Sequence, residues 1–214
     1  MGKLYNSILS GSSGKIGKVV VANVSGTEVL KMRPRKRTAT PSTKQLLVQE
    51  RLKKAYQFIL PYKAYAAAFF GMKTGIKSCY NMAMSNLLKA FKLDYVNDVI
   101  IPSYNEIEFS KGSLPRPLPT ALTAISTSSF QVTWEDNSNG DPDREADFLQ
   151  ILFIAEEEEE PVFFERKATR IDLSVDINIP TFWTNKNIHV WIAFIDKDYL
   201  MPSQSVYAGK VTLL

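Results

Sequence analysis

The sequence contains a single cysteine, Cys79, and a single histidine, His189. One cysteine excludes an intramolecular disulfide and any cysteine-rich zinc site. One histidine excludes metal centres that are built from several histidines and leaves little for histidine-based catalysis. We therefore expect neither a cofactor nor a metal. We interpret Cys79 as a small core residue in or before a helix, and His189 as a structural residue within a central strand.

Long apolar segments are also absent. The longest run, Ala66 to Phe70 with its flanks, falls well short of the roughly 18 to 20 residues that a membrane-spanning helix needs. The first eleven residues lack the apolar core of a secretory signal. We expect a protein without a membrane span, cytoplasmic or associated with a particle. The composition, 45% hydrophobic and 22% charged, is that of a globular protein and argues against wholesale disorder.

The net charge of +4 hides an uneven distribution. Residues 1–112 carry 18 Lys+Arg and 6 Asp+Glu, whereas residues 113–214 carry 8 and 16, so the net charges are +12 and −8. Such asymmetry indicates two modules with different surfaces. Near residues 110–119, Gly112 and three prolines disfavour a helix and favour an extended linker. We therefore predict a basic module over residues 1–111 and an acidic module over residues 112–214.

The basic module begins with a predicted β-hairpin. Residues 15–24 and 27–32 are rich in β-branched and aliphatic side chains, and Ser25-Gly26 between them provides a tight turn. An isolated hairpin is marginal in water, so we expect it to pack on other elements.

About three helices should follow the hairpin. The first begins near Thr40-Pro41 and is interrupted by Pro61, the second covers residues 62–70 and ends at Gly71, and the third covers residues 78–91. The apolar face of the first helix is predicted to comprise Val48, Leu52, Ala55 and Ile59. That of the third comprises Tyr80, Met84, Leu87, Leu88 and Phe91.

The sequence pattern of the acidic module predicts a β-sandwich. Apolar and polar residues alternate in its strands, as in Phe130, Val132 and Trp134, and turn residues separate them. The seven expected strands are 120–126, 129–135, 147–155, 161–167, 170–177, 187–195 and 205–213. The fold class is therefore α+β: a β-hairpin and about three helices, followed by a seven-stranded immunoglobulin-like sandwich.

Two stretches of the acidic module resemble a fibronectin type III or related immunoglobulin-like domain. They are residues 122–134, two strands ending in a tryptophan, and residues 188–209, a central strand, a loop and part of the last strand. The resemblance covers roughly 100 residues. It implies an adhesive, spacer or interaction module, although such a fold does not determine a function.

The N-terminal sequence is similar to a second group of proteins. Met1-Gly-Lys-Leu, Gly14-Lys-Ile-Gly17, Arg33-Pro-Arg and Thr43-Lys-Gln-Leu46 resemble the corresponding segments of uncharacterised proteins of Bacteroidota. That group also ends in a sandwich region, so the resemblance spans most of the chain. It implies no activity and no functional residues.

Two loops contain residues that bind ligands in other proteins. Gly11-Ser-Ser-Gly14-Lys-Ile-Gly17-Lys18 departs from a phosphate loop because Ile follows Lys15, where a hydroxyl residue is needed, so we favour a turn before a strand over a nucleotide site. Asp136-Asn-Ser-Asn-Gly-Asp-Pro-Asp143 offers oxygen ligands, but its glycine comes at the fifth position rather than the sixth position of an EF-hand loop. A turn without metal is the favoured interpretation, with a calcium site as the alternative.

The densest charges lie in two short segments. The basic segment, residues 31–37, contains Lys31, Arg33, Arg35, Lys36 and Arg37, which can bind nucleic acid, dock on an acidic protein or be solvated. The acidic run contains Glu156, Glu157, Glu158, Glu159 and Glu160. Five adjacent like charges favour a solvated hairpin tip over paired catalytic carboxylates, and this tip is a candidate docking surface for an arginine-rich patch of a neighbouring copy.

These features favour a non-catalytic structural or assembly protein. In this hypothesis the basic module attaches to a partner and the sandwich serves as a spacer or interaction surface, and a virion-derived or surface-apparatus component fits the description. The alternative is a nucleic-acid-associated protein that uses the basic segment. An enzyme is the weakest hypothesis because no catalytic constellation is found. We expect a protein partner or self-association.

Overall fold

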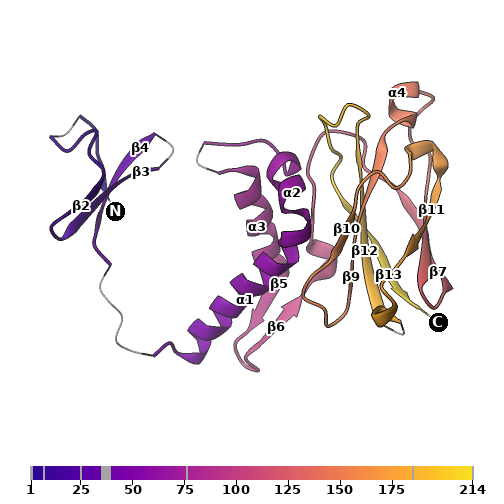
Figure 1. Cartoon of the computed structure of the whole chain (residues 1–214), viewed down its shortest axis with the longest axis horizontal. Helices are drawn as coiled ribbons and strands as arrows, with labels where there is room; N and C mark the ends of the chain where they lie inside the picture. The colour runs from indigo at the N-terminus through magenta and orange to yellow at the C-terminus, as the bar shows by residue number, and fades with distance from the viewer. Residues whose placement is uncertain are drawn as a thin grey trace. The chain divides into compact units, whose positions relative to one another are not determined.

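The computed structural model describes residues 2–6, 8–24, 26–34, 40–75, 77–184 and 186–213. The fold is α+β, as predicted, and contains an N-terminal sheet, three main helices and a β-sandwich (Figure 1). The chain forms two compact units. The N-terminal unit comprises Met1–Ser42 and Lys73–Lys77, and the main unit comprises Thr43–Met72 and Ser78–Leu214.

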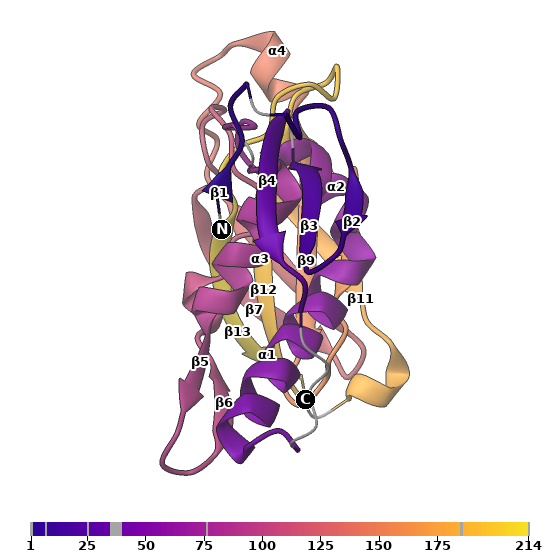
Figure 2. The ribbon, with the colours of Figure 1, turned by 90° about the vertical axis from the view of Figure 1, so that its left-hand side faces the viewer.

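The N-terminal unit contains a four-stranded antiparallel sheet in the order β1-β4-β3-β2 (Figure 2). The predicted hairpin is confirmed as its centre. The expected first strand is divided, because the chain turns at Gly17, whose φ of 58° favours glycine. The strands are β1 (Gly2–Lys3), β2 (Gly14–Ile16), β3 (Val19–Val24) and β4 (Thr27–Met32).

The helices of the main unit follow the prediction with two differences. The first helix begins at Thr43, after the predicted start at Thr40-Pro41, and its exposed residues include Val48 and Leu52, which were expected to be buried. Its buried residues are Leu47, Ala55, Phe58 and Ile59. The helices are α1 (Thr43–Ile59), α2 (Lys63–Phe69) and α3 (Cys79–Ala90), with a single 3-10 turn (Leu60–Tyr62) at Pro61.

A two-stranded hairpin that the sequence analysis missed follows α3 directly. It pairs β5 (Phe91–Asp94) with β6 (Val99–Pro102), and the short 3-10 turn Tyr104–Glu106 comes next. No glycine occurs in the connection, where Asp98 adopts a φ of 54° and Asp94 accepts hydrogen bonds from the backbone amides of Val96 and Asn97. The turn is therefore stabilised by an aspartate side chain.

All seven predicted sandwich strands are present, in a four-stranded sheet (β10-β9-β12-β13) and a three-stranded sheet (β11-β8-β7). This arrangement resembles a fibronectin type III domain. The strands are β7 (Pro119–Ser126), β8 (Ser129–Trp134), β9 (Phe148–Ala155), β10 (Val162–Phe164), β11 (Ser174–Asn178), β12 (Asn187–Ile195) and β13 (Val206–Thr212). Short helical segments lie in the connections: α4 (Pro142–Glu145) and the 3-10 turns Arg170–Asp172 and Thr181–Trp183.

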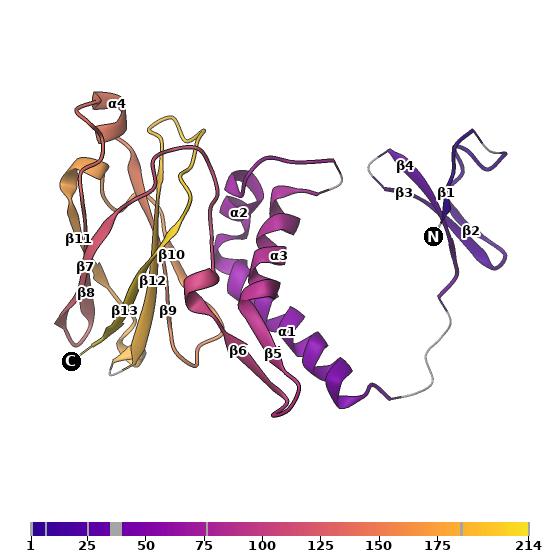
Figure 3. The same ribbon diagram turned by 180° about the vertical axis from the view of Figure 1, so that it is seen from behind.

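The four-stranded sheet is buried on both faces. One face of β12, with Ile188 and Phe194, contributes to the core between the two sheets. The opposite face, with Trp191 and Ile195, contributes to a second core that also contains residues of α1, α2 and α3. Figures 1 and 3 show the helices lying along this sheet on the side away from β7, β8 and β11.

The boundary between the two compact units therefore does not lie near Gly112, where the sequence analysis placed the boundary between the modules. The helices belong with the sandwich because they share the second core with β9 and β12. The segment around Gly112 is extended, as expected, but it packs closely on the sandwich: a Cβ atom at Gly112 would lie 2.0 Å from the carbonyl oxygen of Pro202. Glycine is required there by close backbone approach and not by flexibility.

Candidate functional site

The loop that resembles a phosphate loop binds a carboxylate of the chain itself. The backbone amide of Gly11 donates a hydrogen bond to Glu28 Oε1 at 2.5 Å, and Ser10 Oγ donates to Glu28 Oε2 at 3.0 Å. Lys15 and Ile16 lie in β2. The favoured turn before a strand is therefore what the structure contains, and the backbone amide of Gly11 is engaged by an internal carboxylate.

The loop that resembles a calcium site lies beside a buried arginine. Arg170 Nη2 donates a hydrogen bond to Asp147 Oδ2 at 2.8 Å, and the guanidinium group also donates to the Asn137 side chain and to the carbonyl oxygen of Pro115. Asp136 accepts from the amide of Ser138, which lowers the pKa of that carboxyl group. Among the described residues, no group of three or more His, Cys, Asp or Glu side chains is arranged to hold a metal ion. The Arg170 guanidinium group is the cation that holds this loop, through its hydrogen bonds to Asn137, Pro115 and Asp147.

The basic segment is only partly described. Lys31 is exposed near the end of β4, and Arg33 is exposed just beyond it, with its backbone amide bound to the carbonyl oxygen of Lys18 at 2.8 Å. Arg35, Lys36 and Arg37 lie outside the described residues. The proposed partner contacts of this segment stay a prediction.

Register places three lysines on one face of the N-terminal sheet. Lys15 and Lys31 both pair with Val20, and Lys3 belongs to the next cross-strand row on the same face. The opposite face is mainly apolar, although Asn23 and Glu28 also lie on it near the β3–β4 turn. It carries Ile16, Val19, Val21, Leu30 and Met32.

The acidic run forms the turn between β9 and β10, as the hairpin-tip prediction requires. Glu157, Glu159 and Glu160 are exposed. Glu156 and Glu158 are instead half-buried and paired. Glu158 forms an ion pair with Lys186 at 2.6 Å.

Glu156 belongs to a hydrogen-bonded chain that ends in the second core. Asn187 Nδ2 donates to Glu156 at 2.7 Å and lowers the pKa of its carboxyl group. His189 lies 3.2 Å from Glu156 through Nε2 and 2.7 Å from the Tyr207 hydroxyl through Nδ1, and its ring stacks on Tyr104 at a centroid distance of 3.7 Å. Burial lowers the pKa of His189, although Glu156 opposes this effect. Both ring nitrogens are engaged by protein groups, which supports a structural histidine.

Cys79 lies at the first position of α3. Its thiol donates to the carbonyl oxygen of Gly71 at 3.3 Å and is half-buried against the second core. The side chain therefore helps to join the start of α3 to the segment that directly follows α2. This arrangement is consistent with the predicted packing role.

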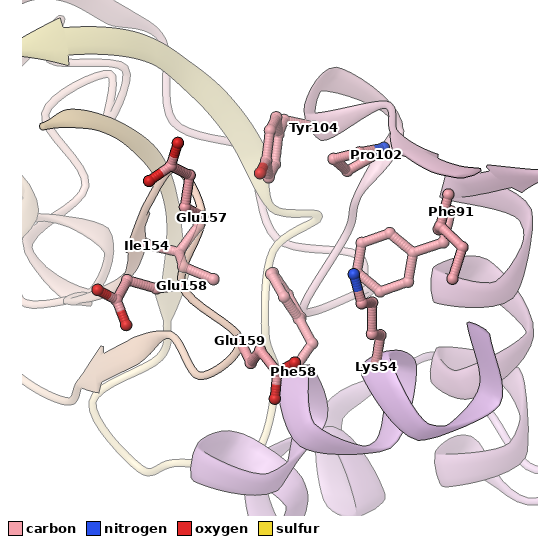
Figure 4. Close-up of a pocket in the computed structure, with 10 residues that line it drawn as sticks. Lys54, Phe58, Phe91, Pro102, Tyr104, Ile154, Glu157, Glu158 and Glu159 are labelled. Carbon is pink, nitrogen blue, oxygen red and sulfur yellow. The ribbon is translucent and has the colours of Figure 1, made fainter. Parts of the chain in front are cut away.

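A pocket of about 260 Å³ lies within the main unit, where the acidic run faces α1 and the β5–β6 hairpin (Figure 4). We call it the junction pocket. Its walls are apolar and its rim is charged, with Lys54 from α1 on one side and three glutamates from the β9–β10 turn on the other. The lining residues are Lys54, Phe58, Phe91, Ile100, Pro102, Tyr104, Ile154, Glu157, Glu158 and Glu159.

The sequence analysis identified only the glutamates of this pocket. Lys54 precedes Glu157 by about a hundred positions, and Tyr104 follows a hairpin that was not predicted. The available signal was the apolar content of β9 and β12 on both faces, which indicates a second layer over the sheet. The pocket can hold an apolar group on its walls and a charged group at its mouth.

Comparisons with solved structures identify separate fibronectin type III domains. The chain is similar to such a domain of human contactin 1 (14% identity, 49% of this chain and 83% of that chain, TM-score 0.35). It is also similar to the FN5 domain of Drosophila Lar (14%, 45% and 92%, 0.33) and to a domain of the human collagen alpha-1(XX) chain (18%, 49% and 84%, 0.34). No curated protein matches the chain.

The remaining comparison covers almost the whole chain. Residues 11–209 match DUF6266, which is described as a family of unknown function. The match includes the N-terminal sheet from β2 onward, the helices and nearly all of the sandwich, in accord with the expected resemblance over most of the sequence. The chain therefore belongs to the DUF6266 family.

Proposed function

We propose that this chain is a non-catalytic structural or assembly protein whose N-terminal sheet attaches it to a partner. The observation that carries the proposal is the apolar face of that sheet. Val21 is 2% exposed, but Ile16 and Met32 on the same face are 45% and 68% exposed. A sheet with one apolar face normally buries it against another layer, so this face is suited to a partner.

The charge of the N-terminal unit supports the same proposal. The unit contains ten Lys+Arg and one Asp+Glu, a net charge of +9, whereas the main unit has a net charge of −5. Self-repulsion disfavours a compact unit of this charge, and an acidic partner surface relieves it. The main unit of a second copy has the required sign, so self-association is the simplest form of attachment.

A two-residue variant tests the attachment. We expect tagged wild-type protein from its native source to elute from a sizing column in a complex, and the Ile16→Ser/Met32→Ser variant to elute as the free chain. The control is Ile125→Ser/Met201→Ser, since these main-unit side chains are exposed by 48% and 50%. Equal elution of the wild type and both variants would contradict the proposal.

The lysine face of the sheet favours nucleic acid as a second candidate partner. Lys3, Lys15 and Lys31 share this face, and lysines release counterions when they neutralise phosphates. Affinity for duplex DNA should then fall with salt by about 0.9 in log–log slope for each phosphate contacted. Replacing the three lysines by glutamine should remove up to about three contacts from that slope. Absence of binding at low salt would eliminate this candidate.

A further inference from the structure

The size of the junction pocket restricts what it can bind. About 260 Å³ is below the roughly 300–1,000 Å³ of pockets that bury drug-sized ligands. A pocket of this size suits one large side chain presented by a protein. Interface hot spots are commonly single anchors of this kind, and arginine is among the residues enriched there.

The walls of the pocket suit a side chain with a long apolar stem. Phe58 and Ile154 are buried and form part of the wall, and the rings of Phe58, Phe91 and Tyr104 surround the space in Figure 4. Aromatic faces attract cations as well as methylene groups. The chain uses this contact elsewhere, since the Arg170 guanidinium lies 3.9 Å from the ring centroid of Phe194.

The rim of the pocket favours positive charge. Glu157 and Glu159 line it and have no hydrogen bond or ion pair within the described part of the chain, whereas Glu158 is paired with Lys186. Glu159 and Phe58 both line the pocket, so an unpaired carboxylate of the described chain and an aromatic wall border the same space (Figure 4). An arginine satisfies both groups: its stem packs on the walls and its guanidinium reaches the carboxylates.

We propose that the junction pocket binds an arginine side chain from the basic segment, residues 31–37, of a second copy of this chain. The segment has five cations in seven residues, and three of them are arginines. The proposal rests on the proposed assembly and adds to it a specific receiving site. It also gives the acidic run a role, because the turn between β9 and β10 brings the carboxylates to the pocket mouth.

Lys54 allows the sign of the ligand's charge to be tested. Its ammonium group is on the rim, 3.9 Å from Glu50 on the same helix, and it repels an entering guanidinium. Lys54→Gln should therefore strengthen binding of a cationic side chain and weaken binding of an anionic ligand. The sign of this change distinguishes the proposed ligand from any ligand with a carboxylate or phosphate.

The test uses a fluorescent peptide with the sequence of residues 31–37 and measures fluorescence anisotropy at low salt. The receptor is the full chain with Arg33→Gln, Arg35→Gln and Arg37→Gln, so that its own basic segment does not compete. We expect saturable binding that is lost when the three arginines of the peptide are replaced by glutamine. A peptide with three lysines in their place should bind more weakly than the arginine peptide.

Variants of the receptor locate the site. Glu157→Gln/Glu159→Gln should weaken binding about 3- to 10-fold, as expected for two solvent-accessible charge pairs. The matched control, Glu135→Gln/Glu160→Gln, makes the same change in net charge at exposed residues that do not line the pocket, and it should change affinity less than about 2-fold. Lys54→Gln should tighten binding about 2- to 5-fold. Thermal unfolding of each variant verifies that the fold is retained.

Three results would overturn the proposal: no peptide binding, equal weakening by the two glutamate pairs, or weaker binding of Lys54→Gln. The assay also separates this proposal from the proposed function. Peptide binding without assembly of the intact chain would contradict the proposed self-association and leave the pocket as an arginine site. Assembly that depends on Ile16 and Met32 without peptide binding would reject the pocket alone.

Discussion

Replacement of Arg170 by methionine is expected to destabilise the main unit strongly. The Arg170 side chain is fully buried and pairs with Asp147 at 2.8 Å. It also binds the Asn137 side chain and the carbonyl oxygen of Pro115, and it stacks on Phe194. Methionine retains part of the packing but leaves these acceptors without their donor. Removing one partner of a buried pair costs about 3–5 kcal/mol, so we expect a loss in that range.

Urea unfolding monitored by tryptophan fluorescence measures this loss, with Arg144→Met as the control. Arg144 pairs with Asp141 at 3.4 Å in a solvent-exposed position, so its replacement should cost less than about 1 kcal/mol. Burial raises the pKa of Asp147 even with Arg170 beside it, and removal of Arg170 should raise that pKa further. The deficit of Arg170→Met should therefore be largest at pH 7 and shrink as Asp147 becomes protonated at lower pH. A loss below about 1 kcal/mol, or a deficit that grows on acidification, would refute this reasoning.

Three further predictions concern the main unit. Gly112→Ala should destabilise it by about 3 kcal/mol in urea unfolding, because the added Cβ would overlap the backbone of Pro202; an unchanged midpoint would contradict this close approach. Burial lowers the folded-state pKa of His189, so the contribution of this residue to the free energy of unfolding should be full above its unfolded pKa of about 6.5 and should be lost as pH falls through the lowered value. Melting temperatures between pH 5 and 8 should therefore depend less on pH in His189→Gln than in the wild type. Identical pH profiles of the two proteins would exclude this mechanism. Residues 112–214 alone should fold as an all-β domain, because the core between the two sheets is complete within them. This fragment should self-associate, because removal of the helices uncovers the outer face of β12. Substantial helix by circular dichroism, or a stable monomer, would count against this prediction.

The sandwich was predictable because its signals are local. In β8, Phe130, Val132 and Trp134 alternate with polar residues, and the structure buries all three. The second core was less accessible to sequence reasoning. β9 and β12 are apolar on both faces, which indicates a covering layer but does not identify it as α1 to α3.

The predicted face of α1 illustrates a second limit. Ala55 and Ile59 are buried as expected, whereas Val48 and Leu52 are exposed although they occupy the same helical stripe. Periodicity identifies an apolar face but not how far along the helix a neighbouring layer extends. The boundary near Gly112 was placed by charge and linker composition, and these properties do not report a shared core.

The two ligand-like loops and the junction pocket show which parts of a site can be recognised in sequence. The departures of the two motifs, at Ile16 and Gly140, were visible in the sequence. The Glu28 carboxylate bound to the first loop and the Arg170 guanidinium beside the second were not. Nor was the meeting of Lys54 with the acidic run, because it depends on the packing of α1 against the sandwich side that carries the β9–β10 turn. Such juxtapositions arise only from tertiary structure.

Sedimentation velocity of the purified full chain tests the central claim most directly. The claim is that the apolar face of the N-terminal sheet attaches one chain to another. We predict concentration-dependent oligomers at modest salt for the wild type and for the control Ile125→Ser/Met201→Ser. The Ile16→Ser/Met32→Ser variant should remain monomeric over the same concentrations. A monomeric wild type at every concentration and salt, or oligomers unaffected by Ile16→Ser/Met32→Ser, would contradict the account.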